Sequence, residues 1–235
     1  PKEEIIANAK ANQDAGANRF AIVTSGRALK GRDFEKALDA YREMKETLTI
    51  DLCASHGLLD EEQFQALHDA GVTSYHHNIE TSRRFFPEIC TSHTYEDRIH
   101  TIKIAQKAGF CVCSGGIIGM GETWEDRLDM AISLAELGIE SIPINALMPI
   151  PGTELADRPQ LSGDEILRTI AIFRFINPAA NIRLAAGRKL LPQNGETAFL
   201  TGASASITGN MLTTSGTTIK EDMQMLGRIG MTNQN

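Results

Sequence analysis

Short apolar segments alternate with longer amphipathic ones along the chain, and this alternation restricts the fold more than any other feature. A buried strand is expected at 19–24 and further strands at 48–54, 72–78, 110–115, 140–147, 181–186 and about 205–208. Helices are expected at 2–15, 33–46, 61–70, 94–108, 124–137, 163–176 and 218–228. The units recur at intervals of roughly 25 to 40 residues, which is typical of βα repeats with a parallel sheet. Asp33 is expected to start the second of these helices as its N-cap. Because no low-complexity linker interrupts the repeats, residues 1–235 are predicted to form a single α/β domain.

The number of predicted strands indicates which parallel fold is involved. Seven strands follow a first helix that no strand precedes. A closed (β/α)₈ barrel has eight strands, so the economical interpretation is a TIM-type barrel whose first strand lies upstream of residue 1. A doubly wound open sheet is the alternative, and it requires a reversal of strand order that a sequence does not reveal.

Composition excludes several classes of partner. A chain of 235 residues with 42% hydrophobic content can bury a full core. Its net charge of −7 argues against nucleic acid or an anionic membrane as the main partner. No apolar run is long enough to span a bilayer. The four cysteines lack the composition of a disulfide scaffold, so we expect a cytoplasmic protein.

Two cysteines lie in the stretch 110–123, which begins as an apolar strand and continues into a glycine-rich turn. Strand side chains alternate between faces, so Cys111 and Cys113 must point to the same side. Two thiols on one face, followed by exposed backbone amides, indicate a soft-metal site beside a polar or anionic ligand. The alternative is a buried strand in which both cysteines are small core residues.

Further polar residues occur where other predicted strands end. Cys53 ends the second strand, the run Tyr-His-His-Asn-Ile-Glu at 75–80 ends the third, and Cys90 lies in the loop that follows. Asn145 and Arg183 interrupt two later apolar strands. Functional groups of a barrel lie at the C-terminal ends of its strands, so several such residues predict a shared pocket.

Several longer motifs are similar to those of one known family. They are Tyr-His-His-Asn-Ile-Glu-Thr-Ser at 75–82, Val-Cys-Ser-Gly-Gly-Ile-Ile-Gly-Met-Gly-Glu at 112–122, Ser-Ile-Pro-Ile-Asn at 141–145, Pro-Gly-Thr at 151–153, Ile-Arg-Leu-Ala-Ala-Gly-Arg at 182–188 and Leu-Thr-Thr at 212–214. In their order and spacing, the chain resembles the biotin synthase family of radical S-adenosylmethionine (AdoMet) enzymes. The resemblance extends over essentially the whole sequence.

This resemblance implies a sulfurtransferase that inserts sulfur between two unactivated carbons of dethiobiotin to form biotin. In the family, a [4Fe-4S] cluster cleaves AdoMet reductively, the resulting 5′-deoxyadenosyl radical abstracts hydrogen, and an auxiliary iron–sulfur cluster gives up the sulfur. Such strong C–H bonds resist side-chain bases, so the cofactors carry the chemistry and no catalytic side chain is expected. The resemblance also implies an electron donor of flavodoxin or ferredoxin type, iron–sulfur assembly machinery and a homodimer.

The sequence departs from the family pattern at the AdoMet cluster. The Cys-x₃-Cys-x₂-Cys motif that binds this cluster in the family is absent from residues 1–235. We expect it upstream of residue 1, in agreement with the expected missing strand. The chain as given is therefore expected to be inactive.

A second departure concerns the auxiliary cluster, which the family usually binds through three cysteines and an arginine. Cys53, Cys113 and Arg183 match three of these positions, but Ala21 occupies the fourth, and alanine cannot bind iron. The thiols of Cys111 and Cys90 are natural substitutes for the cysteine expected at position 21. The resulting hypothesis is a [2Fe-2S] or an altered four-iron cluster, held by Cys53, Cys111 and Cys113 with help from Cys90 or Arg183.

The resemblance also assigns residues to AdoMet and to the substrate. Those expected to contact AdoMet are Asn78, Glu80, Gly115, Gly116 and Gly121; those expected to contact dethiobiotin are His76, Asn145, Thr213 and Thr214. Alternatives stay open for several of them. Glu80 can be a solvent-exposed loop acid, the glycines can serve an ordinary strand-to-helix turn, and the two threonines can belong to a C-terminal turn.

Other classes of protein remain as alternatives. Another biotin-synthase-like barrel, such as a methylornithine synthase or a hydrogenase maturase, would not be expected to keep Cys53, Cys113 and Arg183 together with Asn145. A metal-independent aldolase barrel would need a Schiff-base lysine at a strand end, and no predicted strand carries one. The third alternative is an inactive barrel fragment that only binds or scaffolds.

Overall fold

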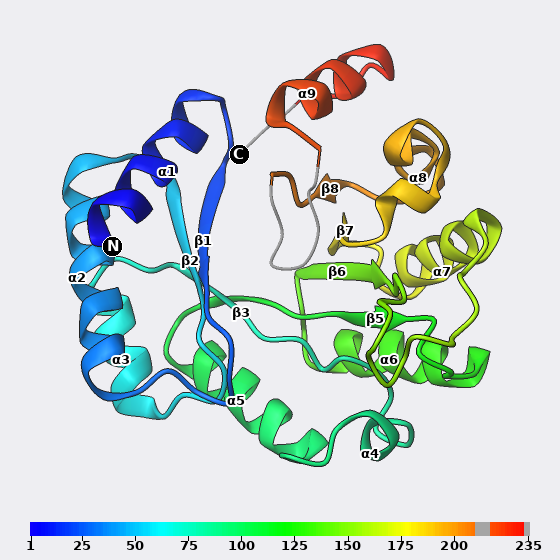
Figure 1. Ribbon diagram of the computed structural model, residues 1–235, viewed down its shortest axis with the longest axis horizontal. Helices are drawn as coiled ribbons and strands as arrows, with labels where there is room; N and C mark the ends of the chain where they lie inside the picture. The colour runs from blue at the N-terminus through cyan, green and yellow to red at the C-terminus, as the bar shows by residue number, and fades with distance from the viewer. Residues whose placement is uncertain (210–216, 233–235) are drawn as a thin grey trace. The chain divides into compact units, whose positions relative to one another are not determined.

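The computed structural model describes residues 1–209 and 217–232, which form two compact units (Figure 1). The first unit comprises Pro1–His77 and Glu96–Val112, and the second comprises Asn78–Tyr95 and the residues from Cys113 on. Within the described residues, the named strands of both units pair in parallel, and helices separate most successive strands. The predicted alternation of strands and helices is therefore confirmed.

The first unit is built from βα repeats around three paired strands. Its elements are α1 (Lys2–Asp14), β1 (Arg19–Val23), α2 (Gly31–Thr47), β2 (Asp51–Ser55), α3 (Glu61–Asp69), β3 (Ser74–His76) and α5 (Tyr95–Lys107) apart from its first residue. Strand β2 pairs with β1 on one side and with β3 on the other. Next to β3, the amide of Cys111 donates a hydrogen bond to the carbonyl of Thr73, with 3.1 Å between N and O.

An aromatic cluster shows which face of this sheet the helices cover. The ring of Tyr75 on β3 packs edge-on against Phe64 of α3, with centroids 4.7 Å apart, and both rings contact Phe110. Side chains alternate along a strand, and in-register neighbours share a face. Ser74 and its register partner Cys53 therefore lie on the opposite, inner face of the sheet.

The second unit has strand β6 at its centre. Its elements are α4 (Phe86–Ile89), the end of β4 (Cys111–Cys113), β5 (Gly116–Ile118), α6 (Trp124–Glu136), β6 (Ser141–Ala146), α7 (Gly163–Ile176), β7 (Asn181–Leu184), the 3₁₀ turns η1 (Arg188–Leu190) and η2 (Pro192–Gly195), α8 (Glu196–Thr201), β8 (Ala205–Ser206) and α9 (Ile219–Arg228). Strand β6 pairs with β4, β5 and β7, and β7 pairs with β8. Capping boxes begin α6, α7 and α9, so the local sequence fixes where these helices start.

A buried ion pair attaches the last helix to the second unit. Arg188 of η1 donates two hydrogen bonds to Asp222 of α9, at 3.0 and 2.7 Å, and both side chains are buried. The hydroxyl of Thr217 donates to the same carboxylate. This bidentate contact fixes α9 by geometry as well as by charge.

Three local predictions are wrong. Helix α2 begins at Gly31 rather than at Asp33, whose carboxylate instead pairs with Lys36 at 2.7 Å. The stretch after β4 is more than a turn, because Gly116–Ile118 pairs with β6 as strand β5. Strand β1 is not fully buried, since Val23 is 42% exposed. Helices α4 and α8 are also additions to the predicted elements.

Among the described helices, none combines the length and apolarity required to cross a membrane. The prediction that residues 1–235 form one domain stays a prediction.

Candidate functional site

In the second unit, a chain of hydrogen bonds joins two of the residues predicted to hold a cluster. The hydroxyl of Ser141 on β6 donates to the sulfur of Cys113 on β4, with 3.2 Å between Oγ and Sγ. The Nε of Arg183 on β7 donates to the same Ser141 oxygen at 3.0 Å. Cys113 and Ser141 are both buried. The cationic group therefore reaches the thiol through one hydroxyl, an arrangement that favours a thiolate or another anionic sulfur at this position.

In the first unit, the thiol of Cys53 lies on the inner face of β2 and is 4% exposed. Its register partners are Ala21 on β1 and Ser74 on β3. The alanine that replaces an expected ligand thus lies directly beside Cys53. Cys111 begins β4 on the other side of β3, and its side chain is half-buried.

The remaining thiol, Cys90, lies in the second unit where α4 ends. Its sulfur lies 3.4 Å from Nδ1 of His93. All four cysteines are thiols rather than disulfides. Over residues 1–209 and 217–232, no group of three or more His, Cys, Asp or Glu side chains is placed to hold a metal ion. The ligand set therefore stays a prediction.

Two of the residues predicted to bind AdoMet lie together in the second unit. Oδ1 of Asn78 accepts a hydrogen bond from the amide of Gly115 at 3.0 Å, and Nδ2 donates to the Glu80 carboxylate at 3.4 Å. The backbone of Glu80 also pairs with Gly115 and Ile117. Glu80 has a φ of +69°, which a non-glycine residue rarely adopts. Strain of this kind is concentrated at functional sites, where the surrounding structure must maintain it.

Glycines 115, 116 and 121 are required by the packing of the chain itself. A Cβ on Gly115 would collide with the carbonyl of Pro143, and one on Gly116 would collide with the carbonyl of Glu80. Gly121 has a φ of +116°, and a Cβ there would meet the guanidinium of Arg158. Packing within the chain therefore accounts for these glycines, and their role toward AdoMet stays a prediction.

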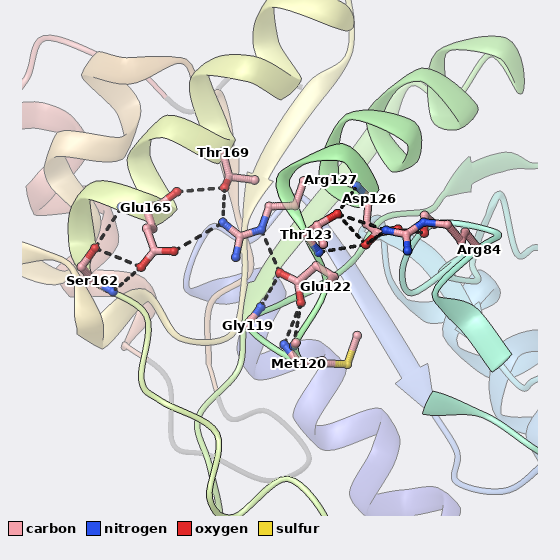
Figure 2. A network of polar contacts seen from close by, with 12 residues as sticks. Arg84, Gly119, Met120, Glu122, Thr123, Asp126, Arg127, Ser162, Glu165 and Thr169 are labelled. Carbon is pink, nitrogen blue, oxygen red and sulfur yellow. Dashed lines mark hydrogen bonds and ion pairs between the residues drawn. The ribbon is translucent and has the colours of Figure 1, made fainter. Parts of the chain in front are cut away.

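The turn that contains Gly121 closes around a buried carboxylate (Figure 2). Glu122 accepts hydrogen bonds from the amides of Gly119, Met120 and Gly121 at 2.7, 2.8 and 3.2 Å. The Nε of Arg127 donates a hydrogen bond to Glu122 at 2.8 Å, and its NH1 lies 3.8 Å from the Glu165 carboxylate. The turn is thus an anion-binding nest whose anion is a side chain of the same chain. No sequence argument had assigned this role to Glu122.

A second carboxylate secures the start of helix α6 (Figure 2). Asp126 accepts hydrogen bonds from Ser82 and Arg84, each at 2.6 Å, and from Thr123. Burial acts to raise the pKa of Asp126, but the hydrogen bonds and the Arg84 charge together lower it. This network joins the segment after Glu80 to α6 within the second unit.

Asn145, predicted to contact the substrate, bridges two backbone segments. Its Nδ2 donates to the carbonyl of Gly116 at 3.1 Å, and its Oδ1 accepts from the amide of Ala186 at 3.2 Å. Each end of the amide can still form one further hydrogen bond. His76 is the half-buried last residue of β3 in the first unit. Thr213 and Thr214 lie outside the described residues.

A buried histidine network in the first unit was missed by the sequence analysis. His56 directly follows β2 and is 1% exposed, with Nε2 3.0 Å from the Tyr41 hydroxyl and Nδ1 3.1 Å from the Thr24 hydroxyl. The Tyr41 hydroxyl also donates to the carbonyl of Cys53 at 3.2 Å. Burial lowers the pKa of His56 to about 4, so the ring is neutral at physiological pH. The sequence did offer one signal for this network: His56 closely follows Cys53, a predicted cluster ligand at the end of the predicted strand 48–54.

Comparisons with known proteins define the class. The model of the radical SAM superfamily matches residues 1–134, and that of the biotin and thiamin synthesis associated domain matches residues 143–232. The solved structure of methylornithine synthase has a TM-score of 0.85 at 19% identity, covering 99% of this chain and 73% of that one. The structure of a maturase of the [FeFe]-hydrogenase has a TM-score of 0.80 at 19% identity, covering 98% and 56% respectively. The fold is that of a radical SAM enzyme, and the predicted TIM-type α/β class is confirmed.

Curated relatives narrow this class to one family. The biotin synthase of Alkaliphilus metalliredigens is 62% identical over 226 residues, which cover 96% of this chain and 71% of that protein. The biotin synthase of Clostridium beijerinckii is 58% identical over 226 residues, covering 96% and 72%. The chain belongs to the biotin synthase family.

Proposed function

We propose that the protein inserts a sulfur atom into dethiobiotin, with the sulfur supplied by an auxiliary iron–sulfur cluster. The observation that carries this proposal is the hydrogen-bonded series Cys113–Ser141–Arg183. An arginine directed through a hydroxyl at a buried thiol suits an anionic sulfur ligand, because the guanidinium compensates charge that a buried site cannot leave unpaired. When bound, AdoMet and the clusters supply the hydrogen-abstracting radical and the sulfur.

The donor set fits a cluster in its chemistry. Thiolate is the preferred ligand of iron–sulfur clusters, and the proposed ligands are Cys53, Cys111 and Cys113, with Cys90 or Arg183 completing the set. Because Ala21 occupies the position beside Cys53, the proposal substitutes Cys111 for the thiol missing at Ala21. Either a [2Fe-2S] or a four-iron cluster is compatible with this number of donors.

The AdoMet site is proposed around Asn78 and Glu80. Their hydrogen bonds to Gly115 and to each other hold a carboxylate and an amide at one edge of the glycine turn. A carboxylate offers the two acceptors that a pair of ribose hydroxyls requires. Asn145 is proposed to use its remaining donor and acceptor on the ureido ring of dethiobiotin, and His76, Thr213 and Thr214 are proposed as further substrate contacts.

The partners follow from family membership and remain proposals. They are dethiobiotin, an electron donor of flavodoxin or ferredoxin type, iron–sulfur assembly proteins and a second copy of the chain in a homodimer. A [4Fe-4S] cluster for AdoMet and a cytoplasmic location belong to the same proposal.

Iron and sulfide analysis after anaerobic reconstitution tests the ligand set. Cys53→Ala, Cys111→Ala and Cys113→Ala are each expected to lose most of the auxiliary cluster relative to the unmodified protein. Ala21→Cys serves as the matched gain-of-ligand variant, because it restores a thiol next to Cys53. Unchanged iron content in Cys111→Ala would exclude the altered ligand set.

Product analysis tests the reaction. A protein in which an upstream Cys-x₃-Cys-x₂-Cys segment precedes residues 1–235, reconstituted and supplied with dethiobiotin, AdoMet and a low-potential reductant, is expected to yield biotin by mass spectrometry. Arg183→Met retains side-chain length without charge and is expected to lower the yield. Absence of biotin from protein whose clusters are intact by iron and sulfide analysis would contradict the proposed function.

A further inference from the structure

The side chain of Ser74 is buried without a hydrogen-bond partner in the described part of the chain. The residue is 1% exposed, and its hydroxyl oxygen has no donor or acceptor within hydrogen-bonding geometry. A buried hydroxyl without a partner costs free energy, so such groups are rare unless a ligand or water completes them. The position of Ser74 indicates which kind of ligand this is.

Two thiol-bearing strands flank Ser74 within the first unit. On one side, Cys53 of β2 is its register partner. On the other side, the amide of Cys111 is bonded to Thr73, the residue just before Ser74. Tyr75 and Phe110 both face the aromatic cluster around α3. By alternation, Ser74, Cys53 and Cys111 therefore share the inner face of the sheet.

A similar pairing in the second unit shows what a serine in this position does. Ser141 is the register partner of Cys113 and donates its hydroxyl to that sulfur. Ser74 has the same relation to Cys53, yet its hydroxyl has no hydrogen-bond partner among residues 1–209 and 217–232. A sulfur atom bound between Cys53 and Cys111 would lie beside the Ser74 strand and could accept this hydrogen bond.

We propose that Ser74 is a positioning residue that donates a hydrogen bond to a sulfur of the auxiliary cluster held by Cys53 and Cys111. This inference rests on the proposed ligand set. Hydrogen bonds to cluster sulfurs stabilise the reduced, more negative state, and they are among the factors that set reduction potential. Ser74 thereby tunes the cluster that gives up sulfur, without itself touching iron.

The test uses the protein reconstituted anaerobically with ferrous iron and sulfide. Ser74→Ala is expected to shift the reduction potential of the auxiliary cluster to a more negative value at unchanged iron content. Resonance Raman spectra in H₂O and D₂O give a second readout, because an exchangeable proton on a cluster sulfur shifts Fe–S stretching bands. This isotope shift is expected to decrease in Ser74→Ala.

Two variants control the comparison. Thr73→Ala removes the hydroxyl of the neighbouring residue, which already donates a hydrogen bond to the Leu52 carbonyl. This variant is expected to leave both the reduction potential and the isotope shift unchanged. Ser74→Thr keeps a hydroxyl and is expected to restore both. The proposal is overturned if Ser74→Ala matches the unmodified protein in both measurements while Cys53→Ala loses the cluster. If Cys53→Ala and Cys111→Ala both keep their full iron content, the ligand set fails and this inference fails with it.

Discussion

Two strand pairs, one in each unit, place a cysteine opposite a serine, and they differ in how the serine is satisfied. Between β4 and β6, Ser141 accepts from Arg183 and donates to Cys113. Between β2 and β3, Ser74 is equally buried and lacks any partner within the described residues. The same pair of residues in the same register therefore has a hydrogen-bonded serine hydroxyl in the second unit and an unbonded one in the first.

Buried polar groups can thus be divided into those whose hydrogen bonds are completed within the fold and those that lack a partner and can bind a ligand. Glu122 belongs to the first kind, because three amides and Arg127 satisfy its carboxylate. Ser141 belongs partly to both kinds, since it is satisfied and also touches a predicted ligand. Removing a satisfied buried group destabilises the fold, whereas removing an unsatisfied one costs little. Measured stabilities can therefore test the assignment group by group.

The largest effect is expected at Glu122. Glu122→Ala leaves Arg127 as a buried charge without its main partner and leaves three turn amides unbonded. We expect a loss of about 3–5 kcal/mol in the free energy of unfolding, measured by urea titration. Asp129→Ala, on the exposed side of the same helix, is the control and should change it by less than about 0.5 kcal/mol. A loss below about 1 kcal/mol at Glu122 would mean that the nest does not support the fold.

A pH-dependent effect is expected from His56. Its pKa is about 4 in the folded protein and 6.5 when unperturbed, so the unfolded chain takes up the proton first as pH falls. The stability contribution of the neutral ring is complete above pH 6.5 and is lost as pH falls toward 4. Between pH 7 and pH 5, the unmodified protein should therefore lose about 2 kcal/mol more than His56→Gln.

An exposed histidine provides the control for this measurement. His68→Gln, on α3, should keep the pH dependence of the unmodified protein, because the His68 side chain is 58% exposed. If the free energy of unfolding changed equally with pH in His56→Gln and in the unmodified protein, the ring would not remain neutral in the folded state.

The sequence predicted the repeating units but not the contacts that distinguish the two serines. The period-two rule predicts Cys111 and Cys113 on one face of their strand, and this stays a prediction. Strand β5 was missed because its first residue, Gly116, belongs to a Gly-Gly pair typical of turns, and only pairing with β6 makes the segment extended. The contact of Ser141 with Arg183 joins residues 42 positions apart, which requires the register of two strands. Likewise, whether the Ser74 hydroxyl has a hydrogen-bond partner depends on which side chains the neighbouring strands place around it.

Ser141→Ala tests the satisfied serine. The substitution removes an acceptor from the half-buried Arg183 and a donor from Cys113. In protein without clusters, we expect a loss of about 1 kcal/mol in the free energy of unfolding, the usual contribution of a buried hydrogen bond. An unchanged value would indicate that water replaces the hydroxyl and that the pairing with Cys113 contributes nothing to the fold.

Ser74→Ala, measured in the same cluster-free protein, is expected to have the smallest effect and the opposite sign. The substitution removes a buried hydroxyl that has no partner to lose, so the free energy of unfolding should stay constant or rise by up to about 1 kcal/mol. A loss equal to that of Ser141→Ala would mean that Ser74 is already hydrogen-bonded without a cluster. The two strand pairs would then be equivalent, and the reason for assigning a sulfur ligand to the Ser74 hydroxyl would disappear.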